Sequence, residues 1–215
     1  MSKKFHEELK QVENDLIKMG SVVEKNIYDC IISLKNTDIE LANKVIDSDD
    51  RIDDFELDLK ERCSQLIALH QPVAKDLRTI LVASEMVTSL ERMGDHTCNI
   101  AYMVKRIGKE ELLKPLIDIP RMSQITGSRL NSSLDAFINR DIKMAKQIAR
   151  EDEKIDKLDE QIMRELLTYM MEDSGTIKQA NSLLFISRFL ERMGDQTTNI
   201  CEGIIYLVSG ERQNY

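Results

Sequence analysis

The chain has 215 residues, of which 42% are hydrophobic and 32% are charged, and its formal net charge is −8. Its 8 glycines and 3 prolines are about half the number that an average composition would give, which favours long helices over a strand-rich fold with many turns. The negative charge and the lack of a basic stripe argue against nucleic acid as a partner, and no run of 18 apolar residues is present to insert into a membrane.

The N-terminal segment and the cysteines bear on the cellular compartment. Residues 1–8 are charged and no apolar run follows them, so no signal peptide is expected. The four cysteines form no C-x-x-C pair, and each lies within a helical pattern. We therefore expect reduced thiols in or near the core of a cytoplasmic protein.

Three helices are predicted in the first half of the chain. The first covers residues 3–35 and ends at Asn36-Thr37-Asp38, where Asp38 can cap the next helix. The second is expected to continue without interruption from residue 39 until Pro72 stops it, and the third covers residues 74–107. Residues 108–120 then form a linker, after which the same pattern repeats to residue 208.

The second half repeats the first in sequence. Residues 90–100 (LERMGDHTCNI) and 190–200 (LERMGDQTTNI) match at nine of eleven positions, 100 residues apart. An upstream D-I-x-x-A-x-x-[VI] segment occurs at Asp38 and again at Asp141, 103 residues apart. The chain is therefore an internal duplication.

The duplication predicts the fold class and the domains. Antiparallel helices of about 30 residues joined by short turns are typical of helical bundles. We expect an all-α protein with two tandem homologous three-helix bundles, residues 1–108 and 109–215, placed end to end.

Each half carries two acidic pairs at i,i+4 spacing. Like charges at this spacing cost an isolated helix roughly 0.2–0.5 kcal/mol each, so their repetition is notable. In each antiparallel hairpin the two pairs are equally distant in sequence from the turn, at residue 72 in the first half and at residues 172–175 in the second. Each bundle should therefore bring four carboxylates to one level, about 30 Å from its turn. The pairs are Asp49/Asp53 with Glu91/Asp95, and Asp152/Asp156 with Glu191/Asp195.

Four converging carboxylates repel one another unless a cation joins them. Their hard oxygen ligands suit iron, Mn, Mg or Ca, and suit Zn less well. Gly94 and Gly194 lie mid-helix, where a missing side chain lets a neighbouring helix or an ion approach. Asn99 and Asn199 lie one turn further on and are candidates to hold the ligands by hydrogen bonds.

The histidines are not expected to be ligands. His96 follows Asp95, but the equivalent residue in the second half is Gln196. None of the three histidines has the E-x-x-H spacing of a ferritin-like di-iron site.

Two other interpretations of the acidic pairs remain open. In the first, the acids lie on solvent-exposed helix faces of a purely structural scaffold. In the second, they bind the metal of an enzyme such as a phosphohydrolase or an oxidase. The sequence contains no Gly-rich phosphate loop, G-x-S-x-G or H-E-x-x-H motif. We expect a protein that is not an enzyme, with no catalytic residues and no organic cofactor.

At these motifs the sequence resembles the PhoU family of bacterial phosphate-uptake regulators. The matching segments are HQPVAKDLR (70–78), LERMGD-x-x-x-NIA (90–101), LERMGD-x-x-x-NI (190–200) and the two D-x-x-I-D segments at 49–53 and 152–156. The resemblance implies two three-helix bundles, and metal clusters bound by acidic motifs that correspond to the eight carboxylates above.

The resemblance also implies a role and partners. It implies an adaptor that represses the phosphate-starvation response through the ATPase of the phosphate ABC transporter and a membrane-bound sensor histidine kinase, and that commonly forms a homodimer. One departure is that the second half reads SGTIKQANS where the first has the P-x-x-x-D-L-R segment. If that segment contacts a partner, only the first bundle is expected to do so.

Overall fold

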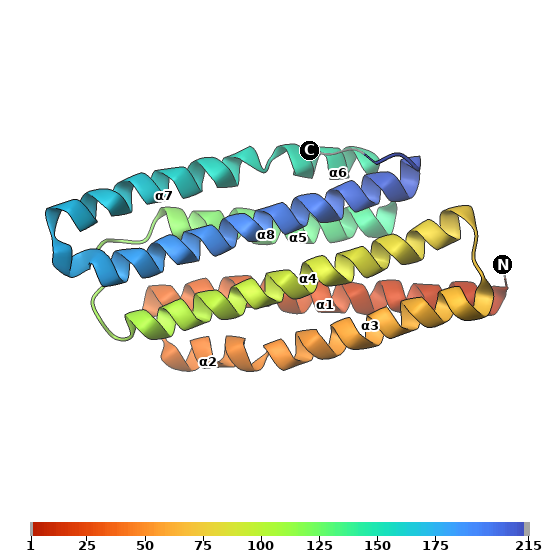
Figure 1. Ribbon diagram of the computed structural model, residues 1–215, viewed down its shortest axis with the longest axis horizontal. Coiled ribbons are helices and arrows are strands. Elements are labelled where there is room, and N and C mark those ends of the chain that lie inside the picture. The colour runs from red at the N-terminus through yellow and green to blue at the C-terminus, as the bar shows by residue number, and fades with distance from the viewer. Residues whose placement is uncertain (1, 213–215) are drawn as a thin grey trace.

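Helices account for all the regular secondary structure in residues 2–212, which are the residues that the computed structural model describes (Figure 1). This confirms the all-α prediction. In chain order they are α1 (Lys3–Asn36), α2 (Ile39–Asp47), α3 (Asp49–His70), α4 (Ala74–Ile107), α5 (Asp118–Asn139), α6 (Ile142–Arg150), α7 (Glu153–Glu172), the short 3-10 helix η1 (Ser174–Thr176) and α8 (Ile177–Ser209).

The repeated D-I segments are helix N-caps. The Asp38 carboxylate accepts a hydrogen bond from the backbone N–H of Leu41 at 2.9 Å, and Thr37 before it takes a left-handed conformation with φ of 50°. The Asp141 carboxylate accepts from the backbone N–H of Met144 at 3.0 Å. Such caps satisfy N–H groups that the first turn of a helix leaves unpaired, which explains why both halves begin a helix at this motif.

The prediction of one uninterrupted second helix in each half is wrong. The helix breaks at Ser48 in the first half and at Glu151 and Asp152 in the second. The Ser48 hydroxyl donates to the Val45 carbonyl at 3.0 Å, and a side chain that competes in this way for a backbone acceptor interrupts a helix. The break places Asp49 at the first position of α3, where the positive end of the helix dipole favours a carboxylate.

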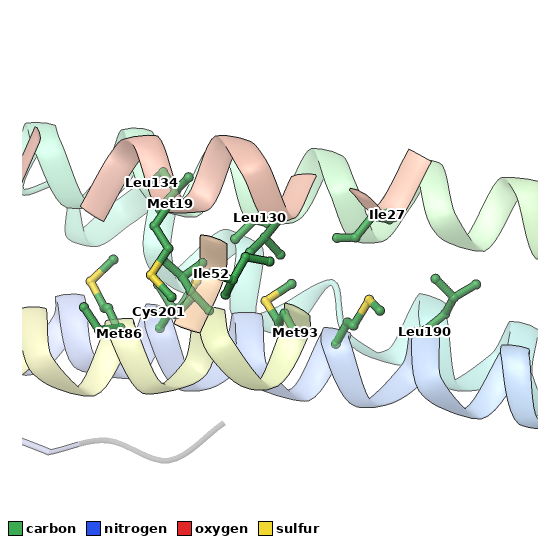
Figure 2. Close-up of a cluster of buried hydrophobic side chains, with 14 of the residues drawn as sticks. Met19, Ile27, Ile52, Met86, Met93, Leu130, Leu134, Leu190 and Cys201 are labelled. Atoms are coloured by element: carbon green, nitrogen blue, oxygen red, sulfur yellow. The ribbon is translucent and has the colours of Figure 1, made fainter. Parts of the chain in front are cut away.

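The two halves pack side by side, and the end-to-end arrangement expected from the sequence is wrong. Helix α4 lies along α8 in the antiparallel direction, and α1 packs against α5 (Figure 1). One hydrophobic core runs through both halves, and Figure 2 shows part of it, with Met19 from α1, Met93 from α4, Leu130 from α5 and Leu190 from α8. The physical reason is that α4 and α8 are apolar over much of their circumference, so a single bundle cannot cover them.

The segment between the halves is shorter than predicted and docks on the second half. Helix α5 begins at Asp118, because Pro120 is tolerated in a first helical turn. The backbone N–H of Leu113 donates to Gln179 Oε1 at 2.6 Å, and Lys114 forms an ion pair with Glu165 on α7. In the described part of the chain, no helix is both long and apolar enough to cross a membrane.

Candidate functional site

The four carboxylates of the first half act on one another electrostatically. Burial and, after it, the charges of Asp95, Glu56 and Asp53 together raise the pKa of Glu91 to about 7. Burial also raises the pKa of Asp49; a hydrogen bond with the Cys98 thiol partly opposes this, and Asp53 and Asp95 add to it. We call Asp49, Asp53, Glu56, Glu91 and Asp95 the first acidic cluster.

The second half builds the matching cluster from α7, the residue before it and α8. Burial and, after it, the Asp195 charge raise the pKa of Glu191 to about 7, against the opposing charge of Arg188. Burial raises the pKa of Asp195 as well, followed by the charges of Asp152 and Asp156. We call Asp152, Asp156, Asp159, Glu191 and Asp195 the second acidic cluster.

The fifth acid of each cluster is a residue that the sequence analysis missed. Glu56 adds to the raised pKa of Glu91, and Asp159 adds to that of Glu191. Each lies three residues after the second aspartate of its pair, and the two are 103 residues apart, like the other matched positions of these helices. That spacing was a usable signal, because residues three apart share a helix face.

The second cluster contains a buried arginine that the sequence analysis also missed. Arg129 on α5 is 3% exposed and forms an ion pair with Asp152. Its second guanidinium nitrogen, Nη2, donates to the Ile148 carbonyl and to Thr198 Oγ1, both at 3.1 Å. The equivalent residue in the first half is Asn26, which is buried and donates through Nδ2 to the Ser48 hydroxyl.

The two mid-helix glycines allow α3 and α7 to approach closely, as the sequence predicted. A Cβ added at Gly94 would lie 2.9 Å from Ile52 Cδ1 and 3.7 Å from Asp49 Oδ1. At Gly194 it would lie 2.9 Å from Asp152 Oδ1 and 3.3 Å from an Arg129 nitrogen. Both glycines therefore bring the first aspartate of each cluster close to the backbone of the opposite helix.

Metal binding by the eight predicted ligands stays a prediction. Among residues 2–212, no three His, Cys, Asp or Glu side chains are arranged closely enough to hold one ion. Asn99 is half-buried, whereas Asn199 is exposed and lines a cavity between α4 and α8. The first cluster nevertheless presents the donors that a hard cation prefers, carboxylate oxygens in mutual repulsion.

The histidine and cysteine side chains are poor ligand candidates. His96 stacks on Phe189 with ring centroids 5.7 Å apart, and burial together with Arg192 and Arg92 lowers its pKa to about 4. All four cysteines are buried and free, as expected. Burial raises the pKa of the Cys63 thiol to about 11, so it is protonated at neutral pH.

A cavity of about 350 Å³ lies between α4 and α8, and residues such as Ser89, Arg92, Asn199 and Tyr206 line it. The position equivalent to Ser89 in the second half is Phe189, whose ring stacks on His96. None of the eight predicted metal ligands is among the residues described as lining the cavity. This cavity therefore lies apart from the eight carboxylates and does not enclose them.

The chain matches the family model of the PhoU domain twice, over residues 16–104 and 119–204. It is 39% identical over 209 residues to the phosphate-specific transport system accessory protein PhoU homolog of Clostridium acetobutylicum, covering 97% of this chain and 95% of that protein. It is 38% identical over 211 residues to the phosphate-specific transport system accessory protein PhoU of Escherichia coli, covering 98% and 88%. The crystal structure of PhoU from Pseudomonas aeruginosa superposes with a TM-score of 0.93 at 35% identity, covering 96% of this chain and 100% of that one.

Proposed function

Because the chain belongs to the PhoU family of phosphate-transport accessory proteins, we propose that it represses the phosphate-starvation response when phosphate is plentiful. In this role it acts in the cytoplasm and is not an enzyme. The observation that carries the proposal is the double domain match, which spans both halves of the duplication.

The role is tested by deleting the gene and growing the cells in phosphate-rich medium. We expect starvation genes to be expressed and phosphate uptake to rise, and we expect the wild-type gene on a plasmid to restore repression. Unchanged uptake and unchanged expression in the deletion strain would contradict the proposal.

The proposed partners are the ATPase of the phosphate ABC transporter and a sensor histidine kinase, and the proposed assembly is a homodimer. The relatives' names, which place them in phosphate-specific transport, support a transporter partner. Binding of the purified chain to each purified partner by calorimetry tests the first part, and light scattering after size exclusion tests the second. Since P-x-x-x-D-L-R occurs at residues 72–78 alone, we expect Asp76→Ala or Arg78→Ala to weaken binding.

We also propose that the acidic clusters bind metal ions such as iron, Mn, Mg or Ca. The fit is best in the first cluster, where Asp49, Asp53, Glu91 and Asp95 supply oxygen donors that repel one another. A bound cation would remove that repulsion. Such an ion would join α3 to α4 at the level of Gly94 and stabilise the folded protein.

Elemental analysis of protein purified without chelator tests the metal proposal. We expect metal in the wild type and its loss in a variant that carries alanine at Glu91, Asp95, Glu191 and Asp195. Equal metal content in the two proteins would contradict the proposal. Turnover of phosphate esters in the presence of Mg, Mn or Fe, lost in the same variant, would favour the enzyme interpretation instead.

A further inference from the structure

The two acidic clusters differ at one equivalent pair of buried positions. Asn26 on α1 and Arg129 on α5 are 103 residues apart, the same separation that relates Asp49 to Asp152 and Asp53 to Asp156. Both side chains are buried, with 4% and 3% of their surface exposed. The first half therefore has a neutral amide at the position where the second half has a guanidinium.

The guanidinium of Arg129 lies in the interior of the second cluster. It is ion-paired with Asp152, and it lies 3.3 Å from the position that a Cβ on Gly194 would occupy. Its Nη2 donates to the Ile148 carbonyl and the Thr198 hydroxyl, and its Nε is buried without a partner. The Arg129 charge opposes the raised pKa of both Asp156 and Asp195. One buried cation thus acts on three carboxylates of the cluster.

No corresponding cation lies in the interior of the first cluster among the described residues. Asn26 donates to the Ser48 hydroxyl, which in turn donates to the Val45 carbonyl at 3.0 Å. Val45 is the equivalent of Ile148. In the first half an uncharged hydroxyl therefore donates the hydrogen bond to this carbonyl, whereas in the second half the Arg129 guanidinium donates it. At the position of Thr198 the first half has Cys98, whose thiol contacts Asp49.

Cations at the cluster surfaces do not produce this difference. In the first cluster, Lys60 pairs with Glu56 at 2.6 Å, and its charge also lowers the pKa of Glu91. In the second, Arg188 pairs with Glu191 at 2.7 Å and with Asp159 at 3.6 Å. Each cluster has a cation of this kind, and both side chains are partly exposed, so solvent screens them. The buried guanidinium is what distinguishes the two clusters.

We infer that Arg129 is a built-in counter-ion that takes the place of a metal in the second acidic cluster, so that, of the two clusters proposed above as metal sites, the first is the one that binds the ion. This inference rests on the proposed metal binding. A divalent cation brought beside Arg129 would meet a like charge in a poorly solvated place and would compete with it for the Asp152 carboxylate. In the first cluster the cation would meet carboxylates, the Asn26 amide and the Cys98 thiol, and a nearby cation, Lys60, is partly exposed and pairs with Glu56.

A reciprocal exchange of the two residues tests the inference, with Mn²⁺ alone as the probe. Bound Mn²⁺ is measured by equilibrium dialysis and elemental analysis, and thermal unfolding is followed with and without MnCl₂. We expect Asn26→Arg to weaken the affinity for Mn²⁺ at least tenfold. We expect Arg129→Asn to gain a second Mn²⁺-binding event, and Asp195→Asn added to it should remove that gain.

Asparagine substitutions in each cluster keep the test decisive even if Arg129→Asn fails to fold. Asp49→Asn with Asp95→Asn should remove the Mn²⁺ bound to the otherwise unchanged protein, and Asp152→Asn with Asp195→Asn should not. Glu7→Gln with Glu160→Gln is the control for the loss of two negative charges, because both residues are exposed and lie outside the clusters.

The outcomes separate this inference from the proposed metal binding. Equal losses of Mn²⁺ from the two asparagine pairs, or a folded Arg129→Asn protein with no added Mn²⁺, would overturn the assignment while metal binding stands. Absence of Mn²⁺ and of every other metal from the wild type would contradict the proposed metal binding, and with it the assignment to the first cluster.

Discussion

The two acidic clusters show how a duplicated fold keeps its packing while its polar interior diverges. Around Gly94 and Gly194 the apolar neighbours are the equivalent residues Ile52 and Ile155, and Glu91 and Glu191 both have a pKa raised to about 7. The interior behind them differs, with Asn26 in one half and Arg129 in the other. Packing constrains side-chain volume and shape, whereas a carboxylate can be neutralised in more than one way.

The largest expected effect comes from removing the buried arginine. Arg129→Ala leaves Asp152, the Ile148 carbonyl and the Thr198 hydroxyl without their partner, and breaking a buried ion pair costs about 3 kcal/mol or more. Asn26→Ala removes one hydrogen bond to Ser48 and should cost about 1 kcal/mol. Urea unfolding measures both values for the metal-free proteins. Equal losses of unfolding free energy in the two variants would show that Arg129 does not neutralise the carboxylates of its cluster.

A smaller difference is expected at the two glycines. Gly194→Ala places a Cβ 2.9 Å from an Asp152 oxygen that the ion pair with Arg129 holds in place, so it should destabilise by about 2 kcal/mol. Gly94→Ala meets the end of Ile52, and the better helix propensity of alanine should limit the loss to about 1 kcal/mol. The same unfolding measurement decides the order, and a greater loss at Gly94 would contradict it.

The pH dependence of stability should be common to the two halves. The pKa values of Glu91 and Glu191 lie near 7 in the folded protein, against an ordinary value of 4.5. The folded state therefore binds more protons between these values, and the contribution of both groups to stability is lost as the pH rises from about 4.5 through 7. The effect should be of similar size in the two halves, because both side chains are partly buried at equivalent positions.

Thermal unfolding of the metal-free protein between pH 5 and pH 8 measures this dependence. Glu91→Gln and Glu191→Gln should each flatten the profile by a similar amount. A profile that neither substitution changes would mean that other groups govern the pH dependence in this range.

The smallest effect is expected from the surface cation of the first cluster. The residue equivalent to Lys60 in the second half is Met163, so Lys60→Met makes the two halves alike at this position. The Lys60–Glu56 pair is an i,i+4 pair on a partly exposed helix face, and its loss should cost about 0.5 kcal/mol or less. A loss several times greater in urea unfolding would show that Lys60 contributes to the charge balance of the first cluster as strongly as Arg129 does in the second.

Local features of the sequence predicted most of the helical framework. Asp38 was correctly placed as a cap, and Pro72 lies in the turn between α3 and α4 as expected. The breaks at Ser48 and at Glu151 were missed, because the apolar stripe continues across them without an interruption in the sequence. Arg129 was missed because its meaning depends on Asp152, Ile148 and Thr198, which lie 19 to 69 residues away in the chain.

The all-α class, the duplication and the hairpin turns could be predicted from the amino-acid sequence alone, as could the i,i+4 spacing of the acids. Each of these depends on spacing along one helix or on a match between two segments, which a linear pattern records. The side-by-side arrangement of the halves follows from contacts between distant segments, since the packing of α4 against α8 covers their remaining apolar surface. The difference between a guanidinium in one acidic cluster and an amide in the other also follows from tertiary contacts. Which charges lie next to a buried side chain depends on its neighbours in space and not on its neighbours in the sequence.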